Sequence, residues 1–191
     1  MSENPSFGQA FCASKKVGGY RMSEKKLVID QLKLTYEGLF DMNGLWRLID
    51  AWFYEKGYDR WEHKNFEQIM PTGKDIEIEL LPWKKTTEYF KNTIRIRIKV
   101  SKMKDVEVEK KGVKLKLNQG ELRMIFDGYL ESDYEHKWEG RAIFFFIRTI
   151  FDKYFFRSTT NFYEKWLIND VHDIHGRIQR FLNLYRYEKH I

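Results

Sequence analysis

Two histidines near the C-terminus have a spacing that suits a metal site. His172 and His175 are three residues apart, with Asp170 and Asp173 beside them. Residues three apart lie on the same face of a helix, so both imidazoles and a carboxylate can reach one metal ion. The same spacing also occurs on the solvated flank of an ordinary helix. We expect the second interpretation, and we predict neither a metal nor another cofactor.

Acidic residues gather upstream of another histidine, at Asp127, Glu131, Asp133, Glu135 and His136. Clustered carboxylates can bind a divalent cation, but this spacing matches no calcium loop, and the group can equally end a solvated strand. The sequence has no glycine-rich phosphate loop, no GxSxG and no HExxH. We therefore expect binding rather than catalysis, although an active site assembled from distant residues would carry no such motif.

Aromatic residues make up 17% of the chain, including six tryptophans. Most of these rings are expected to fill the core. The alternative is an aromatic-lined cavity that binds an apolar small molecule. The candidate ligand-binding residues for that cavity are Trp46, Trp52, Phe144, Phe151 and Phe155.

The net charge of +6 suggests nucleic acid as an alternative partner, for an RNA- or ribosome-associated factor. The basic excess lies at the two ends of the chain, and residues 1–26 carry five Lys or Arg against two Glu. An excess of this size is also common in soluble domains. The candidate nucleic-acid-binding residues are Lys15, Lys16, Arg141, Arg148, Arg157, Arg177 and Arg180.

The length of 191 residues predicts one domain. Residues 1–26 are rich in Gly and Ser and lack an apolar period, so we expect a flexible basic tail followed by a single α+β domain over 27–191. The single cysteine, Cys12, excludes an intrachain disulfide. No secretory signal and no apolar run of membrane-spanning length is present, so we expect a cytoplasmic protein.

The domain is expected to open with a strand near Leu27 and then a helix over 42–56. Apolar residues recur at helical spacing through that segment. Asp41 is the predicted N-cap, with its carboxylate accepting hydrogen bonds from the first turn. Gly57 is expected to end the helix in the left-handed conformation.

Alternating sequences then predict a run of antiparallel strands, at 60–70, 75–80, 94–100, 106–109 and 113–117. Asn118-Gln119-Gly120 is read as a hairpin loop that leads into a strand over 121–130. The outward residues of the alternating strands are acidic, basic, acidic and basic in turn. If consecutive strands are neighbours, opposite charges face each other across each pair and stabilise the register. The other interpretation is that the basic rows bind phosphates.

Two helices are expected after the strands. Residues 140–156 are apolar around most of the circumference, which predicts burial on more than one side. Ser158 to Asn161 is expected to break the helix, and a final helix follows over 161–187. Its apolar stripe is a candidate for oligomerisation or partner binding. That stripe consists of Tyr163, Leu167, Val171, Ile174, Ile178, Phe181 and Tyr185.

The predicted fold class is α+β. We expect an antiparallel sheet of about six to seven strands, one short helix after the first strand, and long C-terminal helices packed on one face. Over residues 27–157, this element order resembles the helix-grip fold of the START-like (SRPBCC) superfamily. Residues 36–187 also resemble uncharacterised archaeal proteins. The START-like resemblance implies a curved sheet around a long helix and a binding protein for an apolar small molecule. A protein partner or a homodimer through the C-terminal helix is the other expectation.

Overall fold

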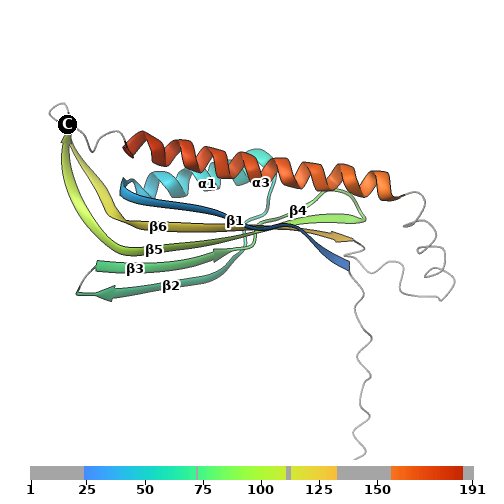
Figure 1. Ribbon diagram of the computed structural model, residues 1–191, viewed down its shortest axis with the longest axis horizontal. Helices are drawn as coiled ribbons and strands as arrows, with labels where there is room; N and C mark the ends of the chain where they lie inside the picture. Colours follow the sequence, from blue (N-terminus) through green and yellow to red (C-terminus); the bar gives the residue numbers. More distant parts are fainter. Residues whose placement is uncertain (1–23, 72, 111–112, 133–155, 187–191) are drawn as a thin grey trace, which may run out of the picture.

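The computed structural model describes residues 24–71, 73–110, 113–132 and 156–186. These residues form a six-stranded antiparallel sheet with two helices over one face, which confirms the α+β class (Figure 1). The elements in chain order are β1 (Glu24–Phe40), α1 (Met42–Lys56), β2 (Glu62–Met70), β3 (Gly73–Leu80), β4 (Trp83–Lys85), β5 (Phe90–Lys110), β6 (Val113–Ser132) and α3 (Phe156–Arg186).

The sheet has the strand order β1-β6-β5-β3-β2, and the short β4 pairs with β5. The first strand therefore pairs with the last, and the chain crosses through α1 to the far edge before it returns strand by strand. Alternation in β3, β5 and β6 buries one apolar row per strand, such as Ile94, Ile96 and Ile98. The helices cover this row (Figure 1).

Two pairs of predicted strands are in fact single long strands. Residues 94–100 and 106–109 both belong to β5, and residues 113–117 and 121–130 both belong to β6. The predicted loop at Asn118-Gln119-Gly120 is therefore wrong, because these residues pair with Phe40, Leu39 and Gly38 of β1. The glycine permits close packing instead of a turn. A Cβ at Gly120 would lie 3.0 Å from the carbonyl oxygen of Ser101.

The predicted charge pairing is confirmed where the acidic and basic rows lie on neighbouring strands. Glu77 of β3 lies opposite Lys99 of β5. Glu107 of β5 likewise lies opposite Lys116 of β6. The expected pairing between 94–100 and 106–109 is wrong, because both segments belong to β5.

Helix α1 has the predicted bounds, and Gly57 ends it at φ 70°, in the left-handed region. Asp41 occupies the N-cap position, but its side chain makes no capping hydrogen bond. The Met42 N–H donates instead to Oδ1 of Asn118, over 3.1 Å. The strand that contains Asn118 thus supplies the acceptor that the sequence assigned to Asp41.

Strand β1 begins earlier than predicted, at Glu24, so residues 24–26 belong to the sheet and not to the tail. A bulge interrupts β1 at Gln31, whose φ is 49°. The Gln31 N–H donates to Oδ1 of Asp127 over 2.9 Å, and Arg97 donates to Oδ2 over 2.8 Å. Asp127 is only 3% exposed. This carboxylate, a candidate cation ligand in the sequence, therefore holds the bulge.

Helix α3 lies along β1 and β6 and also contacts α1. It begins at Phe156, so the break expected at Ser158 to Asn161 is wrong. Each small polar residue disfavours the helix by only about 0.5 kcal/mol relative to alanine. This cost is too small to end a helix that packs against the sheet. The helix predicted over 140–156 lies outside the described residues except for Phe156.

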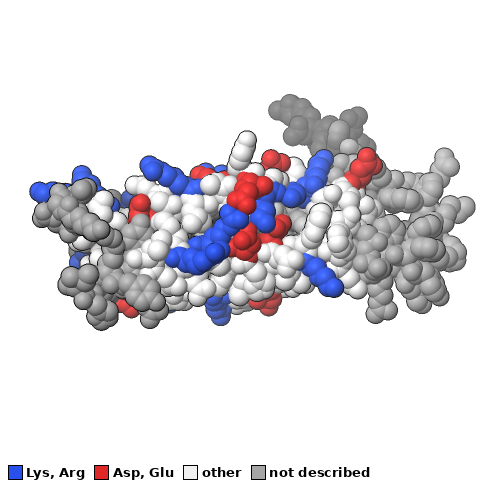
Figure 2. All heavy atoms as spheres, turned by 90° about the horizontal axis from the view of Figure 1, so that it is seen from above, with Lys and Arg blue, Asp and Glu red and all other residues white. Residues whose placement is uncertain are grey.

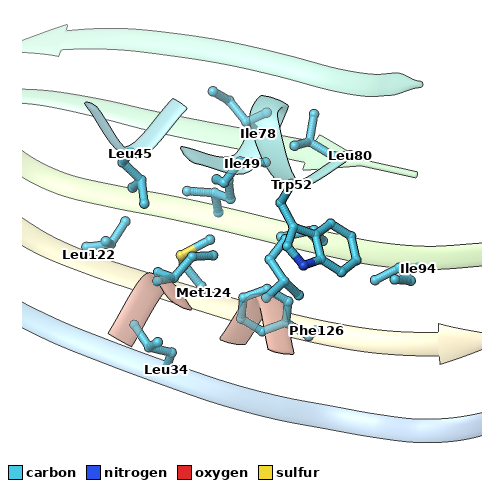
Figure 3. Close-up of a cluster of buried hydrophobic side chains, with 14 of the residues drawn as sticks. Leu34, Leu45, Ile49, Trp52, Ile78, Leu80, Ile94, Leu122, Met124 and Phe126 are labelled. Atoms are coloured by element: carbon cyan, nitrogen blue, oxygen red, sulfur yellow. The ribbon is translucent and has the colours of Figure 1, made fainter. Parts of the chain in front are cut away.

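The core lies between the helices and the sheet (Figure 3). Leu45, Ile49 and Trp52 of α1 point toward the buried rows of the strands. From α3, the fully or almost fully buried residues are Leu167, Val171, Ile174, Ile178 and Leu182. From Tyr163 to Phe181, the apolar stripe considered for oligomerisation therefore packs within this chain, whereas the side chain of Tyr185 lies outside the described residues. Neither described helix is both long and apolar enough to cross a membrane.

Candidate functional site

A hollow of about 470 Å³ lies beside the N-terminal half of α1, on the helix-bearing side of the sheet. Its apolar residues are Met42 and Trp46 of α1, Ile76 and Ile78 of β3, and Met103 of β5. The alternation of β3 directs the isoleucines to this side, and the helical spacing of four places Met42 and Trp46 on one face of α1. The hollow is thus a continuation of the core that remains open to solvent.

Polar residues from α1, β2 and the neighbouring strands surround these apolar side chains. Arg60 binds Asp50 through two contacts of 2.9 and 3.1 Å, and its guanidinium lies 6.0 Å from the ring centre of Trp46. Lys74 pairs with Glu67 over 2.5 Å. Both cations of the hollow are therefore already paired with carboxylates of this chain.

Asn118 also lines the hollow. Its Nδ2 donates to Oδ1 of Asp105 over 2.7 Å, and its Oδ1 accepts from the Met42 N–H. The amide thus joins α1 to the β5–β6 pair. Because these interactions are made within the chain, the shape of the hollow is set before a ligand binds.

Eight of the thirteen residues that line the hollow are polar or charged, so it suits a molecule with several polar groups and a smaller apolar or aromatic part. Its volume falls in the range of about 300–1,000 Å³ that is usual for small-molecule sites. Trp46 offers an aromatic surface, while Arg60, Glu62 and Asn65 offer donors and acceptors. Charges of both signs line the hollow, so it has no strong preference for an anion or a cation.

A second polar cluster joins α1 to α3, and Figure 2 shows acidic and basic groups side by side near the middle of this face. Trp52 donates its indole N–H to Oδ2 of Asp173 over 2.9 Å, and Tyr58 donates to Oδ2 of Asp170 over 3.1 Å. Lys56 lies 3.3 Å from Asp170 and 3.4 Å from Asp173. These contacts orient α3 on α1.

The pKa shifts in this cluster follow from burial and from these partners. Burial works against the charge of Asp173, but hydrogen bonds from Trp52 and Arg177 hold its pKa below the ordinary value. Burial, together with the nearby Asp170 carboxylate, raises the pKa of Tyr58. Burial opposes the charge of Lys56, yet its two aspartates raise the pKa of that amine. All these groups are stabilised in the protonation state they have near neutral pH.

Arg177 extends the cluster to the end of α1. It makes two hydrogen bonds to Glu55, of 2.6 and 2.8 Å, and pairs with Asp173 over 3.2 Å. Its hydrogen bond with Glu55 raises the pKa of the guanidinium. This arginine is a predicted nucleic-acid-binding residue, but two carboxylates already neutralise it.

The sheet face opposite the helices carries paired charges as well. Arg95 pairs with Glu79 and Arg97 with Asp127. The hydrogen bond with Glu79 raises the pKa of Arg95. These pairs argue against the reading in which the basic rows bind phosphates, because a phosphate would have to displace a carboxylate from each arginine.

The predicted ligand-binding residues do not meet in one cavity among the described residues. Trp46 lines the hollow, whereas Trp52 is 1% exposed and belongs to the core. The other three candidates lie outside the described residues: Phe144, Phe151 and Phe155.

The predicted nucleic-acid-binding residues lie mostly outside the described part of the chain. That is so for Lys15, Lys16, Arg141 and Arg148, and for the side chain of Arg157. Arg177 is paired as described above. Arg180 is exposed, and its Nε donates to the carbonyl oxygen of Gly176 within α3.

The two candidate metal ligands have different surroundings. His172 is exposed, whereas His175 lies against the ring of Phe126, with 5.7 Å between the ring centres. Asp170 and Asp173, the neighbouring carboxylates, are held by Tyr58, Lys56 and Trp52. Within the described ranges, no group of three or more His, Cys, Asp or Glu is placed to hold a metal ion.

Sequence reasoning missed most of the residues that line the hollow. Arg60, Lys74, Met103 and Asn118 come from four different places in the chain, and only the sheet order brings them together. The one sequence feature that pointed to the hollow was the apolar row of β3, which lies next to the exposed strand β2.

Comparison with protein-family models, with curated proteins and with solved structures finds no match for this chain.

Proposed function

We propose that this chain is a binding protein whose ligand occupies the hollow beside α1. The observation that carries the proposal is the combination of a 470 Å³ volume with Trp46 and four other apolar residues in its lining. Polar groups on the surrounding strands would fix the orientation of the ligand. The ligand class is a small molecule with several polar groups and a smaller apolar or aromatic part.

The START-like resemblance enters this proposal in a modified form. The long helix α3 over an antiparallel sheet is in keeping with a helix-grip arrangement. Leu167, Val171 and Ile174 are fully buried between α3 and the sheet. We therefore propose a ligand site beside α1 rather than beneath the C-terminal helix.

The experiment compares three proteins purified from the native host: the wild type, Asn65→Trp and Gln68→Trp. Asn65 lines the hollow, whereas Gln68 lies three positions along the same exposed strand, opposite Asp75, and is not part of the lining. Native mass spectrometry measures the fraction of protein that carries a bound small molecule. We expect N65W to reduce that fraction about tenfold by filling the hollow, and Q68W to leave it unchanged.

Retention of the bound molecule by N65W would place the ligand elsewhere and contradict the proposal. Equal losses in N65W and Q68W would contradict it too, because they would indicate damage to β2 instead of a filled hollow. A wild-type protein that carries no small molecule would leave a protein partner as the better explanation of the exposed strand.

RNA binding remains the alternative function, and the basic residues outside the described ranges motivate it. Backbone-phosphate contacts would make such binding steeply dependent on salt. Filter binding of a mixed RNA pool at about 50 and about 200 mM salt tests this, with a loss of about 10³ or more expected for six or more phosphate contacts. Binding that does not change with salt would exclude the alternative.

A further inference from the structure

Strand β2 forms one edge of the sheet, and among the described strands it pairs only with β3. No strand among the described residues pairs with the backbone N–H and C=O groups of its other edge. Such an edge is a template for another extended chain. A β-strand is therefore the partner that can hydrogen-bond to the backbone groups of this edge.

The side chains of β2 are unusual for an edge that faces only water. Every residue from Glu62 to Met70 is exposed. Three of them are nevertheless large and apolar: Phe66 is 51% exposed, Ile69 81% and Met70 39%. Trp61, immediately before the strand, is 60% exposed. Apolar residues on both faces of a free edge are typical of a strand that pairs with another chain.

The other edge of the sheet is protected in ways that β2 is not. Strand β1 has two register shifts and a left-handed residue at Gln31, which bend its edge. Helix α3 also packs against β1. In β2 the register with β3 is continuous from Lys64 to Met70. The regular, unprotected edge is thus β2.

We propose that β2 pairs antiparallel with β2 of a second copy of this chain, about a two-fold axis normal to the sheet. Such an axis keeps each residue on its own face, so residues of the same parity lie opposite each other. Their outward-pointing N–H and C=O groups then also meet. The pairing would join two six-stranded sheets into one continuous sheet.

The charges of β2 are compatible with the register centred on Phe66, and contact between the two phenylalanines favours it. In that register Phe66 lies opposite its own copy, Lys64 opposite the partner's Gln68, and Glu67 opposite the partner's Asn65. No like charges oppose each other, and each phenylalanine covers the other. The register centred on Glu67 would place two carboxylates face to face and is disfavoured.

This dimer goes beyond the proposed function and does not depend on it. It has one consequence for the hollow. Asn65 and Glu67 lie on the helix-bearing side of β2 and line the hollow. The same two residues of the partner would lie directly across the axis, so the hollows of the two copies would face each other.

The test measures molar mass by light scattering, between about 1 and 100 µM, the range in which a small interface is expected to associate. The wild type should rise from the monomer mass of 23.3 kDa toward twice that value. Phe66→Lys should remain monomeric, because it places two lysines face to face at the axis. Phe66→Glu should be monomeric for the same reason.

An equimolar mixture of F66K and F66E should recover the dimer, because opposite charges then face each other. Leu184→Lys is the matched control, because Leu184 is an exposed leucine of α3, remote in sequence from β2 and 69% exposed. It should dimerise like the wild type. Circular dichroism checks that each variant is folded, which is expected because position 66 is solvent-exposed in the monomer.

Hydrogen exchange gives a second measurement that needs no variant. Amides of β2 should exchange at least about threefold more slowly at the high concentration than at the low one, whereas α3 amides should not change. A wild type that is monomeric throughout would overturn the proposal, even if it bound a foreign peptide at β2. A dimer that survives F66K, or a mixture that fails to recover it, would also overturn the pairing.

Discussion

Asp173 illustrates how single charges hold this fold together. Its carboxylate accepts the indole N–H of the buried Trp52 and pairs with both Lys56 and Arg177. Asp127 does the same for the bulge in β1, through Gln31 and Arg97. Both residues belong to acidic groups that the sequence offered as candidate cation ligands. Their neighbours show that they stabilise the fold.

The lowered pKa of Asp173 predicts an acid-dependent loss of stability. Because the folded-state pKa lies below the ordinary value of 3.8, the charged carboxylate stabilises the fold above that pH. The contribution is lost as the pH falls through the folded-state pKa. Asp173→Asn should lower the free energy of unfolding by about 1 kcal/mol near neutral pH and by much less below the folded-state pKa.

Urea unfolding at about pH 7 and at the lowest pH at which the wild type is still folded measures this difference. Glu121→Gln is the control, because Glu121 pairs only with the exposed Arg123 in the described contacts. It should change stability by less than about 0.5 kcal/mol at either pH. An equal loss for D173N at both values would show that shape, and not charge, explains the role of Asp173.

Helix α1 connects the two edge strands of the sheet, β1 and β2, and supplies one wall of the hollow. Its C-terminal end depends on Gly57, whose φ is 70°. A Cβ added at this position would have no atom within 4 Å. The stop is therefore a matter of backbone conformation alone. Helix α3 contains a comparable open glycine, Gly176, in ordinary helical backbone.

Alanine at these two glycines should have opposite effects. Gly57→Ala should destabilise the protein by about 1 kcal/mol, because a Cβ disfavours the left-handed region. Gly176→Ala should stabilise it by about 0.5–1 kcal/mol, because alanine has the higher helix propensity. Thermal unfolding of both variants measures the two signs. Destabilisation by both would mean that unseen contacts, not backbone conformation, decide the effect.

The described residues share one core that is built from elements distant in sequence. The sheet places β1 beside β6, and α3 covers that pair while α1 covers the neighbouring strands. Ile174 of α3 is 0% exposed within this core. Because α3 shares its core with the sheet, we expect the helix and the sheet to unfold together.

Ile174→Ala tests that cooperation. The substitution should lower the free energy of unfolding by about 2–5 kcal/mol through the lost apolar contacts and the cavity left behind. Leu184→Ala, at an exposed position of the same helix, should change it by less than about 0.5 kcal/mol. Circular dichroism and tryptophan fluorescence should follow one common transition in urea. Separate transitions would show that α3 and the sheet are independent units.

Local patterns in the sequence were enough to predict most of the helices and strands. Helical spacing and Gly57 defined α1, and alternation defined the strands and the opposite charges of Glu77 and Lys99. These features depend on residues near one another in the chain. The break at Ser158 to Asn161 and the loop at Asn118 to Gly120 were wrong: α3 continues through the first segment, and the second pairs with β1.

Which residues lie together in a site depends on the three-dimensional arrangement of the strands and helices. The hollow needs α1, β2, β3 and β5 together, and the pairing of β1 with β6 is what carries α1 to its place. Local patterns could not show that Trp46 faces the hollow while Trp52 fills the core. Nor could they show that β2 forms an edge of the described sheet. Both facts follow from the strand order, which depends on contacts between residues far apart in the sequence.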